Sequence, residues 1–226
     1  MNTKVKILAV AALAMATLNA ASAEAPDLKG DVGLEYTSQH YFRGQSVSTD
    51  TVQASFGADF DIGGLGAFVD YSTNQSLDRD IGDDKQDTSV GIKTSFLEDT
   101  LSVSVGLFHY EYTAGSSELE GFVSATYNTF LSPTVRLYRN TDESLSTYEA
   151  AVSHGFDLGV ATLTLGAGVG ETDLTTAADS DYYELSARAT RSLGDSIDAF
   201  AGLSYNDADN RAESDTFGGG GVSIKF

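Results

Sequence analysis

The 226-residue sequence contains no cysteine and only two prolines. Without cysteine, the chain forms no disulfide, carries no thiolate nucleophile and builds no cysteine-based metal site. Pro26 and Pro133 both fall outside the interiors of the strands predicted below, as the missing N–H of proline requires. Thiol chemistry and a disulfide-stabilised domain are therefore excluded.

Basic residues are also scarce. The chain has 13 Lys and Arg against 33 Asp and Glu, a formal net charge of −20. A surface of this charge repels nucleic acid and other polyanions unless divalent cations bridge them. We therefore expect no nucleic-acid partner.

Beyond its N-terminus the chain has no apolar run near the roughly 20 residues of a membrane-spanning helix. A helical membrane protein is thereby excluded. A membrane β-barrel is not, because its strands are apolar on one face only. The composition, with 41% hydrophobic residues and 23 glycines, suits such a barrel as well as a soluble all-β domain.

The N-terminus has the features of a secretory signal peptide over residues 1–23. Two lysines supply the positive start, an apolar stretch follows over residues 7–18, and residues 21–23 (Ala-Ser-Ala) form a cleavage site. The mature chain is predicted to begin at Glu24, with one domain over residues 24–226. Two of the 13 basic residues and none of the 33 acidic ones lie in the signal, which leaves a net charge of −22. Export without cysteine fits a bacterial envelope protein.

Alternating apolar and polar residues predict twelve β-strands in the rest of the chain. In the second strand, Val52, Ala54 and Phe56 fall on one face, while Gln53 and Ser55 fall on the other. Strands of this kind are close to the length of about 9–11 residues that crosses a bilayer at a tilt. The predicted strands span residues 31–43, 51–62, 65–73, 87–96, 100–112, 119–130, 134–140, 145–156, 159–170, 181–192, 197–206 and 215–226.

The connections between these strands alternate in length. Every second connection is short, such as residues 63–64 and 157–158, whereas most of the others are longer and acidic, such as residues 74–86 and 171–180. A soluble sandwich has no reason to sort its loops in this way, but an outer-membrane barrel has short periplasmic turns and longer external loops. We therefore predict an all-β fold, a transmembrane antiparallel up-and-down β-barrel of about 12 strands, with both termini periplasmic.

Aromatic residues follow the same polarity. Phenylalanines gather at strand ends next to short turns and tyrosines gather toward the long loops, which predicts the two aromatic girdles of a membrane barrel. The phenylalanines are Phe60, Phe96, Phe130, Phe156 and Phe226, and the tyrosines are Tyr36, Tyr71, Tyr110, Tyr112, Tyr182, Tyr183 and Tyr205.

The last ten residues form a two-faced strand with Val222, Ile224 and Phe226 on one face. Taken alone, this strand also fits the edge of a soluble sandwich. It resembles the last strand of bacterial outer-membrane β-barrels. That resemblance implies that the segment ending at Phe226 is read by the barrel-assembly machinery and seals the barrel against the first strand.

A second resemblance lies near the predicted mature N-terminus, where residues 41–46 read Tyr-Phe-Arg-Gly-Gln-Ser and begin a serine-rich loop. This motif is similar to that of the TorF-type porin family (Gcw_chp), small exported proteins of Gram-negative bacteria. Chain length, signal peptide and terminal phenylalanine agree with the family, although the motif itself covers only this stretch. The resemblance implies an outer-membrane porin and leaves its solute open.

If the apolar face meets lipid, the polar face lines the lumen. Charges there bias the passage of ions, and their acidic surplus predicts a preference for cations. The same charges also fit a salt-bridge network that fills a narrow barrel, because unpaired buried charge is costly. The predicted pore-lining residues are Glu35, Asp59, Asp70, Lys93, Arg136, Glu149, Glu184, Arg188, Asp198 and Lys225, with Glu120 on the same face.

Arg43 lies where the first strand enters an external loop, and it is a candidate gate residue at the mouth of the barrel. Pairing with loop carboxylates is the alternative, since exposed ion pairs are common. Phe68, Phe122, Phe200 and Phe217 also point inward in this register and are large enough to block the lumen.

Neither a metal nor a cofactor is predicted. The acidic loops carry oxygen ligands of the kind that Ca²⁺ prefers, but the EF-hand spacing is absent, so loose bridging to lipid phosphates is expected. His40, His109 and His154 show no metal-ligand spacing, and the chain has no GxSxG motif of a serine hydrolase. We therefore do not expect an enzyme.

Together these patterns predict a porin-like passive channel of the cell outer membrane for small cationic or neutral solutes. The expected partners are outer-membrane lipid, lipopolysaccharide, the barrel-assembly machinery, and small solutes or ions. A closed structural barrel whose acidic external loops bind partners or divalent cations is the alternative.

Overall fold

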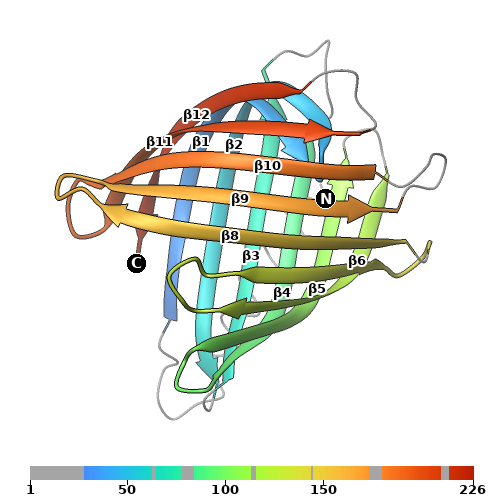
Figure 1. Ribbon diagram of the computed structural model, residues 1–226, viewed down its shortest axis with the longest axis horizontal. Coiled ribbons are helices and arrows are strands. Elements are labelled where there is room, and N and C mark those ends of the chain that lie inside the picture. Colours follow the sequence, from blue (N-terminus) through green and yellow to red (C-terminus); the bar gives the residue numbers. More distant parts are fainter. Residues whose placement is uncertain are drawn as a thin grey trace, which may run out of the picture.

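The computed structural model describes residues 28–62, 65–77, 84–112, 116–143, 145–173, 180–209 and 214–226. These residues form twelve antiparallel strands that close into a single barrel (Figure 1). They contain no helix long and apolar enough to cross a membrane. The strands are β1 (Leu28–Phe42), β2 (Gln45–Ile62), β3 (Leu65–Ser76), β4 (Lys85–Phe96), β5 (Leu101–Tyr112), β6 (Ser117–Tyr127), β7 (Thr134–Asn140), β8 (Ser146–Asp157), β9 (Thr162–Thr172), β10 (Ser180–Ser192), β11 (Ile197–Ala208) and β12 (Asp215–Lys225).

The barrel closes between β1 and β12. Asp31 pairs with Lys225 and Thr37 with Gly219, and backbone hydrogen bonds of 3.0 Å join Gly30 and Phe226 in both directions. The predicted pairing of the last strand with the first is therefore confirmed. It places the start of β1 beside Phe226, at the short-turn end of the barrel.

The outer face of the barrel is apolar because successive side chains of a strand point to opposite faces. Leu34, Val105, Leu203 and Val222 lie within strands and are 53%, 48%, 63% and 44% exposed. Apolar side chains left open in such number form the kind of surface that lipid covers. The predicted alternation thus gives a barrel with an apolar exterior and a polar interior.

The first connection differs from the prediction. A serine-rich loop was expected after Arg43, but β2 begins at Gln45, which pairs with Phe42. Arg43 and Gly44 alone form the turn, with φ angles of 52° and 76°, and two positive φ angles are typical of a type I′ hairpin turn. The start of β2 lacks an apolar face, so hydrophobic alternation does not reveal it as a strand.

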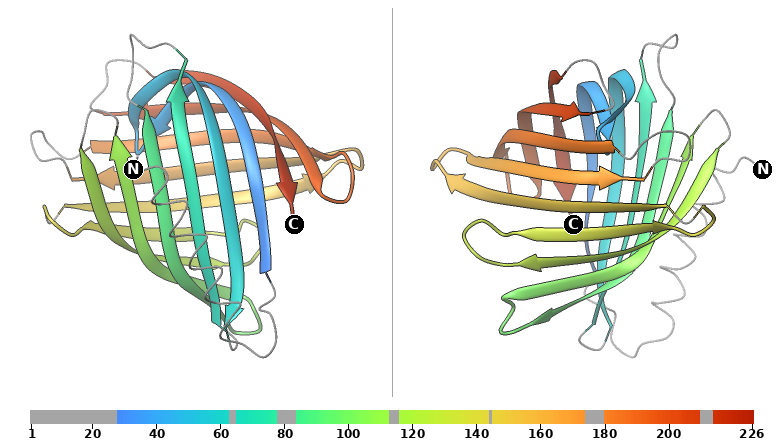
Figure 2. Two further views of the ribbon diagram at one scale, coloured as in Figure 1. Left: turned by 180° about the vertical axis from the view of Figure 1, so that it is seen from behind. Right: turned by 45° about the vertical axis from the view of Figure 1, so that its right-hand side comes forward.

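The β1–β2 hairpin bends over at the loop end of the barrel (Figure 2). Its register shifts by one residue between His40 and Tyr41, and Asp50 on the other strand has a φ of 45°. The register shift marks a β-bulge, and a bulge bends a strand and redirects its side chains. Beyond these two positions Ser48 faces inward, where its hydroxyl lies 2.6 Å from that of Thr51.

The predicted aromatic girdles need two corrections. β6 ends at Tyr127, so Phe130 lies in the β6–β7 turn and not in a strand. Tyr110, Tyr112 and Tyr182 occupy lumen-facing positions of their strands: the first two rings lie near the ammonium of Lys85, and the third donates a hydrogen bond to a lumen carboxylate. Sorting by strand end therefore overlooked which face each tyrosine occupies.

Leu203 provides a test of the lipid-facing surface, because it lies near the middle of β11 and is 63% exposed. Leu203→Lys should lower the free energy of unfolding in a bilayer by about 2–4 kcal/mol, since an ammonium at mid-membrane lacks water. Urea unfolding in lipid vesicles, followed by the gel shift of the folded barrel, measures this loss. Ser204→Lys, one position along and facing the lumen, should cost less than about 1 kcal/mol. Equal losses would contradict the assigned faces.

Candidate functional site

All ten predicted pore-lining residues lie on the inner face of the barrel. Eight of them form four ion pairs, so each of the four predicted basic residues has an acidic partner. The paired atoms are Lys93 Nζ and Asp59 Oδ1 at 2.6 Å, Arg136 Nη1 and Glu149 Oε2 at 3.5 Å, Arg188 Nη1 and Glu35 Oε2 at 3.7 Å, and Lys225 Nζ and Asp198 Oδ2 at 2.5 Å.

The remaining two residues are acidic. Asp70 accepts a hydrogen bond of 2.9 Å from the Ser89 hydroxyl, and Glu184 lines a cavity beside Glu149. Among the described residues, neither carboxylate has a basic partner within ion-pair distance. The four pairs cancel, so these two residues give the predicted set a net negative charge.

Several of these contacts reach across an intervening strand. Lys93 of β4 meets Asp59 of β2 by passing over Gly66 of β3, where a Cβ would lie 2.8 Å from the lysine Cγ. Tyr182 of β10 donates a 2.6 Å hydrogen bond to Glu149 of β8 across Gly170. Inward glycines therefore make room for side chains that lie along the wall of the barrel.

Arg188 of β10 forms an ion pair with Glu35 of β1 that spans two intervening strands, and we call this pair the brace. The guanidinium carbon of Arg188 lies 3.4 Å from the centre of the Phe200 ring, a cation–π contact with β11. Both partners of the ion pair remain partly exposed to the interior, at 46% for Arg188 and 31% for Glu35. The brace places one charge of each sign beside a cavity of about 280 Å³.

A stripe of paired residues crosses the inner wall from β3 to β6, with a phenylalanine at each end and two glycines between them. Its members are Phe68, Gly91, Gly106 and Phe122. These residues pair in sequence across the strands, and the two rings lie 6.2 Å apart over the two glycines. Tyr138 of β7 extends the stripe, with its ring 6.0 Å from that of Phe122. The rings of Phe68 and Phe122 occupy the space that side chains on the two glycines would fill, so they thicken the wall.

The turn of the β1–β2 hairpin reaches into the loop end of the lumen. Arg43 donates two hydrogen bonds, of 2.8 and 2.6 Å, to the Glu120 carboxylate on β6. Its guanidinium carbon lies 4.4 Å from the Tyr138 ring centre and 4.7 Å from that of Phe42. The predicted gate residue thus pairs with a carboxylate of the barrel wall instead of a loop.

The opposite side of the turn contacts the far wall. A Cβ on Gly44 would lie 2.6 Å from Cβ of Tyr182 on β10 and 3.1 Å from Cβ of Ala208 on β11. Tyr41 stacks near Phe217 of β12, with ring centres 5.1 Å apart, and its hydroxyl donates a hydrogen bond to Asp215. The hairpin therefore spans the loop end of the barrel from one wall to the other.

Lys85 of β4 lies beneath this hairpin and is fully buried. Its ammonium is 3.2 Å from the Phe42 ring centre and 2.9 Å from a carboxylate oxygen of Asp87. The separation is short enough for an ion pair, although the angle does not suit a hydrogen bond. The cation–π contact and the neighbouring carboxylate offset the desolvation of this buried charge.

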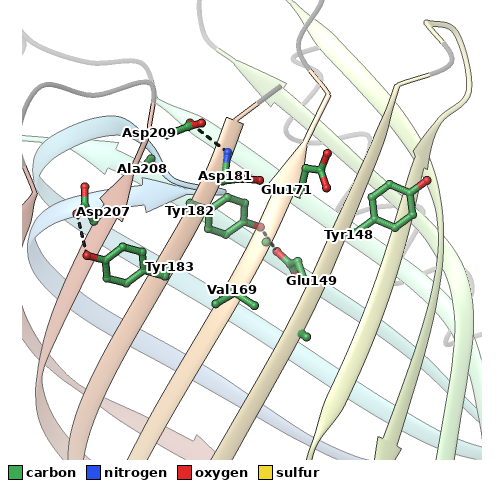
Figure 3. Close-up of a pocket in the computed structure, with 12 residues that line it drawn as sticks. Tyr148, Glu149, Val169, Glu171, Asp181, Tyr182, Tyr183, Asp207, Ala208 and Asp209 are labelled. Carbon is green, nitrogen blue, oxygen red and sulfur yellow. Dashed lines mark hydrogen bonds between the residues drawn. The ribbon is translucent and has the colours of Figure 1, made fainter. Parts of the chain in front are cut away.

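The described part of the lumen is divided into small cavities. One of about 290 Å³ lies among Arg136, Glu149 and Glu184, and one of about 190 Å³ lies beneath the hairpin near Glu118 and Asp173. A larger pocket of about 800 Å³, at the loop end of β8–β11, is drawn in Figure 3. Side chains from both faces line the larger pocket: Tyr148 and Tyr183 are exposed on the outside, whereas Glu149 and Tyr182 face inward.

No cluster of three or more His, Asp or Glu in the described ranges is arranged to hold a metal ion. Much of the acidic loop 74–86, together with residues 174–179 and 210–213, lies outside those ranges. The loose binding of divalent cations predicted for these loops stays a prediction.

No protein-family model matches the chain, and no curated protein matches it in sequence. Its structure is similar to the KdgM porin, with a TM-score of 0.57 and 10% identity over 87% of this chain and 99% of that one. The NanC porin (TM-score 0.55, 11% identity) covers 86% of this chain and 100% of its own length. The COG4313 outer membrane channel from Pseudomonas putida F1 has a TM-score of 0.55 and 13% identity over 88% and 95%.

The chain has the fold of an outer-membrane β-barrel. At 10–13% identity the likeness carries no information on solute or pore residues. Membership of the TorF-type family stays a prediction, because no family model matches.

Sequence reasoning missed the buried residues under the hairpin. Lys85 fell in a predicted loop, and Phe42 was read as the end of a strand leading into another loop. Arg43-Gly44 is a weaker turn signal than Asn-Gly, so the sharp turn was not apparent. One indication of this arrangement is present in the sequence: Arg43 directly follows two aromatic residues, and its place at the end of the first strand indicated a position at the mouth of the barrel.

Proposed function

We propose that the protein is a porin-like passive channel of the outer membrane for small cationic or neutral solutes. The proposal rests on one observation: the ten predicted pore-lining residues form four ion pairs on the inner face of the barrel and leave two surplus carboxylates, Asp70 and Glu184. Ions that pass such a wall meet a negative field, which raises the local concentration of cations. The lumen charges act as a field and a sieve and carry out no chemistry.

The fold supports this proposal, since the structurally similar proteins named above are porins and a channel. The KdgM porin has been solved with disordered oligogalacturonate, an acidic sugar. The acidic surplus proposed here to line the pore favours solutes of the opposite charge. We further propose that both termini face the periplasm, that the strand ending at Phe226 is recognised by the barrel-assembly machinery, and that lipid and lipopolysaccharide surround the barrel.

Single-channel recording in a planar bilayer with a salt gradient tests the proposal. Discrete current steps with a reversal potential of cation-selective sign are expected from folded protein. Protein that is folded, as judged by its heat-dependent gel shift, yet conducts no current would contradict the channel. That result would instead favour a closed barrel acting through its acidic loops.

The two surplus carboxylates should account for the selectivity. In Asp70→Asn/Glu184→Gln, the ratio of cation to anion permeability should fall toward one, because the remaining predicted lumen charges cancel in pairs. Reversal potentials under a tenfold salt gradient measure the ratio. The matched control is Asp59→Asn/Lys93→Gln, which removes an ion pair without changing net charge and should retain selectivity. Loss of selectivity in the control alone would contradict this assignment.

A closed structural barrel remains the second candidate. The observation that favours it is the filling of the lumen by the hairpin and by the rings of Phe68 and Phe122. The two candidates differ in whether the filled lumen can open.

A further inference from the structure

The outermost part of the β1–β2 hairpin is attached to the barrel differently from the rest of the sheet. Backbone pairing of β1 with β12 ends at Thr37, and pairing of β2 with β3 ends at Thr51. Between these points residues 38–50 pair only with each other in the strand ladder. Among the described residues, three hydrogen bonds join the base of this arm to the neighbouring chain: Gly218 N–H to Ser38 Oγ, Ser76 Oγ to Thr49 O and Leu77 N–H to Asp50 O. Three more, from Tyr36, Thr37 and Thr51, join the arm to the lower part of its own two strands.

An isolated two-stranded hairpin is at best marginally stable in water. The docked position of residues 38–50 therefore depends on side-chain contacts at the turn. The strongest is the ion pair of Arg43 with Glu120, whose side chains are 8% and 6% exposed. Charge-assisted bidentate hydrogen bonds of this kind are short and directional, so they hold the turn in one place.

The docked arm also covers polar groups that lack partners. His40 Nε2, on the arm itself, is buried without a hydrogen-bond partner among the described residues. Lys85 is fully buried below Phe42. Water would solvate both of these groups if the arm lifted, so the docked state carries a desolvation cost that opposes its contacts.

Residues 38–50 therefore have few backbone hydrogen bonds to the rest of the sheet, one strong ion pair at the turn (the latch) and a desolvation cost that opposes docking. A segment with these properties can exist in two states, docked and lifted. We propose that residues 38–50 form a gate over the lumen, held closed by the Arg43–Glu120 ion pair. The bulge at His40/Tyr41 and the positive φ of Asp50, where the backbone already departs from regular strand geometry, supply the hinge. This inference rests on the proposed channel function and adds its regulation.

The latch can be tested by a double-mutant cycle in single-channel recordings of protein purified from outer membranes. Arg43→Gln and Glu120→Gln should each raise the ratio of open to closed time by about tenfold, because each cuts the same charge-assisted contact. The double variant should open no more than the single ones, since the second change finds no latch to remove. Independent, multiplying effects would overturn the latch.

Gly44→Ala opens the gate by a second route. Its Cβ would lie 2.6 Å from Cβ of Tyr182, which pushes the turn away from β10 without changing any charge. Arg139→Gln is the control: this arginine lies on β7, near the loop end, and bonds Ser146 instead of the hairpin. It should leave the open time unchanged.

The failures of gate and channel are distinguishable. Current steps with equal open times in the native chain, the latch variants and Gly44→Ala would overturn the gate and leave the channel intact. Absence of current from all of these folded proteins would overturn the channel and the gate with it. Current steps in the native chain, with longer open times in the latch variants and in Gly44→Ala, would support both.

Discussion

Gly106→Val should prevent most molecules of the variant protein from folding into the closed barrel. A Cβ at this position would lie 2.2 Å from the carbonyl oxygen of Val90 and 2.9 Å from Cα of Gly91, both backbone atoms of β4. Backbone in the middle of a sheet cannot yield without breaking the β4–β5 ladder. The ring of Phe122, 2.9 Å away, closes the remaining direction. We expect a loss of about 3 kcal/mol or more in the free energy of unfolding, at the upper end of overpacking costs.

The control for this variant lies on the next strand. Gly121 pairs beside Leu107 of β5 but faces outward, and a Cβ there would meet nothing within 4 Å. Gly121→Val should therefore fold as well as the native chain, and its added methyl groups suit the lipid side. Refolding yield on gels and urea unfolding in vesicles compare the two. If both variants fold equally well, Phe122 and β4 do not pack against Gly106 as described.

The contrast between these glycines shows what periodicity can predict. Alternation in β11, with Ile197, Ala199 and Leu203 on one face and Asp198 and Phe200 on the other, predicts both the strand and the side that meets lipid. The same rule places Gly106 inside and Gly121 outside. It does not reveal that the rings of Phe68 and Phe122 meet each other over the glycines, because that ring contact joins β3 and β6, which are not neighbours.

The partners of the lumen charges were unpredictable for the same reason. The sequence indicates that Lys93 and Asp59 share a face, but they lie two strands apart and 34 residues distant in sequence. Their contact depends on how the strands are staggered around the barrel, which is a property of closure and not of any one strand. Two pairs are of the local cross-strand kind: Arg136 and Glu149 lie directly opposite on β7 and β8, and Lys225 and Asp198 are diagonal neighbours on β12 and β11.

The gate was the least predictable element. Its strands carry few apolar residues, so they show no alternation, and the positive φ at Arg43 is uncommon outside glycine. Glu120 was assigned to the lumen from alternation alone, but its partner lies 77 residues earlier in the sequence. Side chains that meet across the interior of the barrel leave no local sequence pattern, although each obeys the alternation rule of its own strand.

The brace between Arg188 and Glu35 gives the sharpest functional test, because its two halves should have opposite effects. Arg188→Ala leaves Glu35 unpaired beside Glu184 and should increase cation selectivity. Glu35→Gln leaves the arginine unpaired and should decrease it. A unit charge about 5 Å from a passing ion in a water-filled lumen contributes roughly 0.8 kcal/mol, which changes the local ion concentration about fourfold.

Loss of folding stability should not affect the comparison of the two variants. The pair is 3.7 Å apart and both side chains are partly exposed, so its loss should cost less than about 1 kcal/mol in either variant. Both variants lose the same ion pair, and Arg188→Ala also loses the cation–π contact with Phe200. The unpaired charge that remains has the opposite sign in the two variants. Reversal potentials at low salt, where screening is weak, should shift in opposite directions from the native value. A shift in the same direction for both would mean that the pair acts through the shape of the lumen and not through its field.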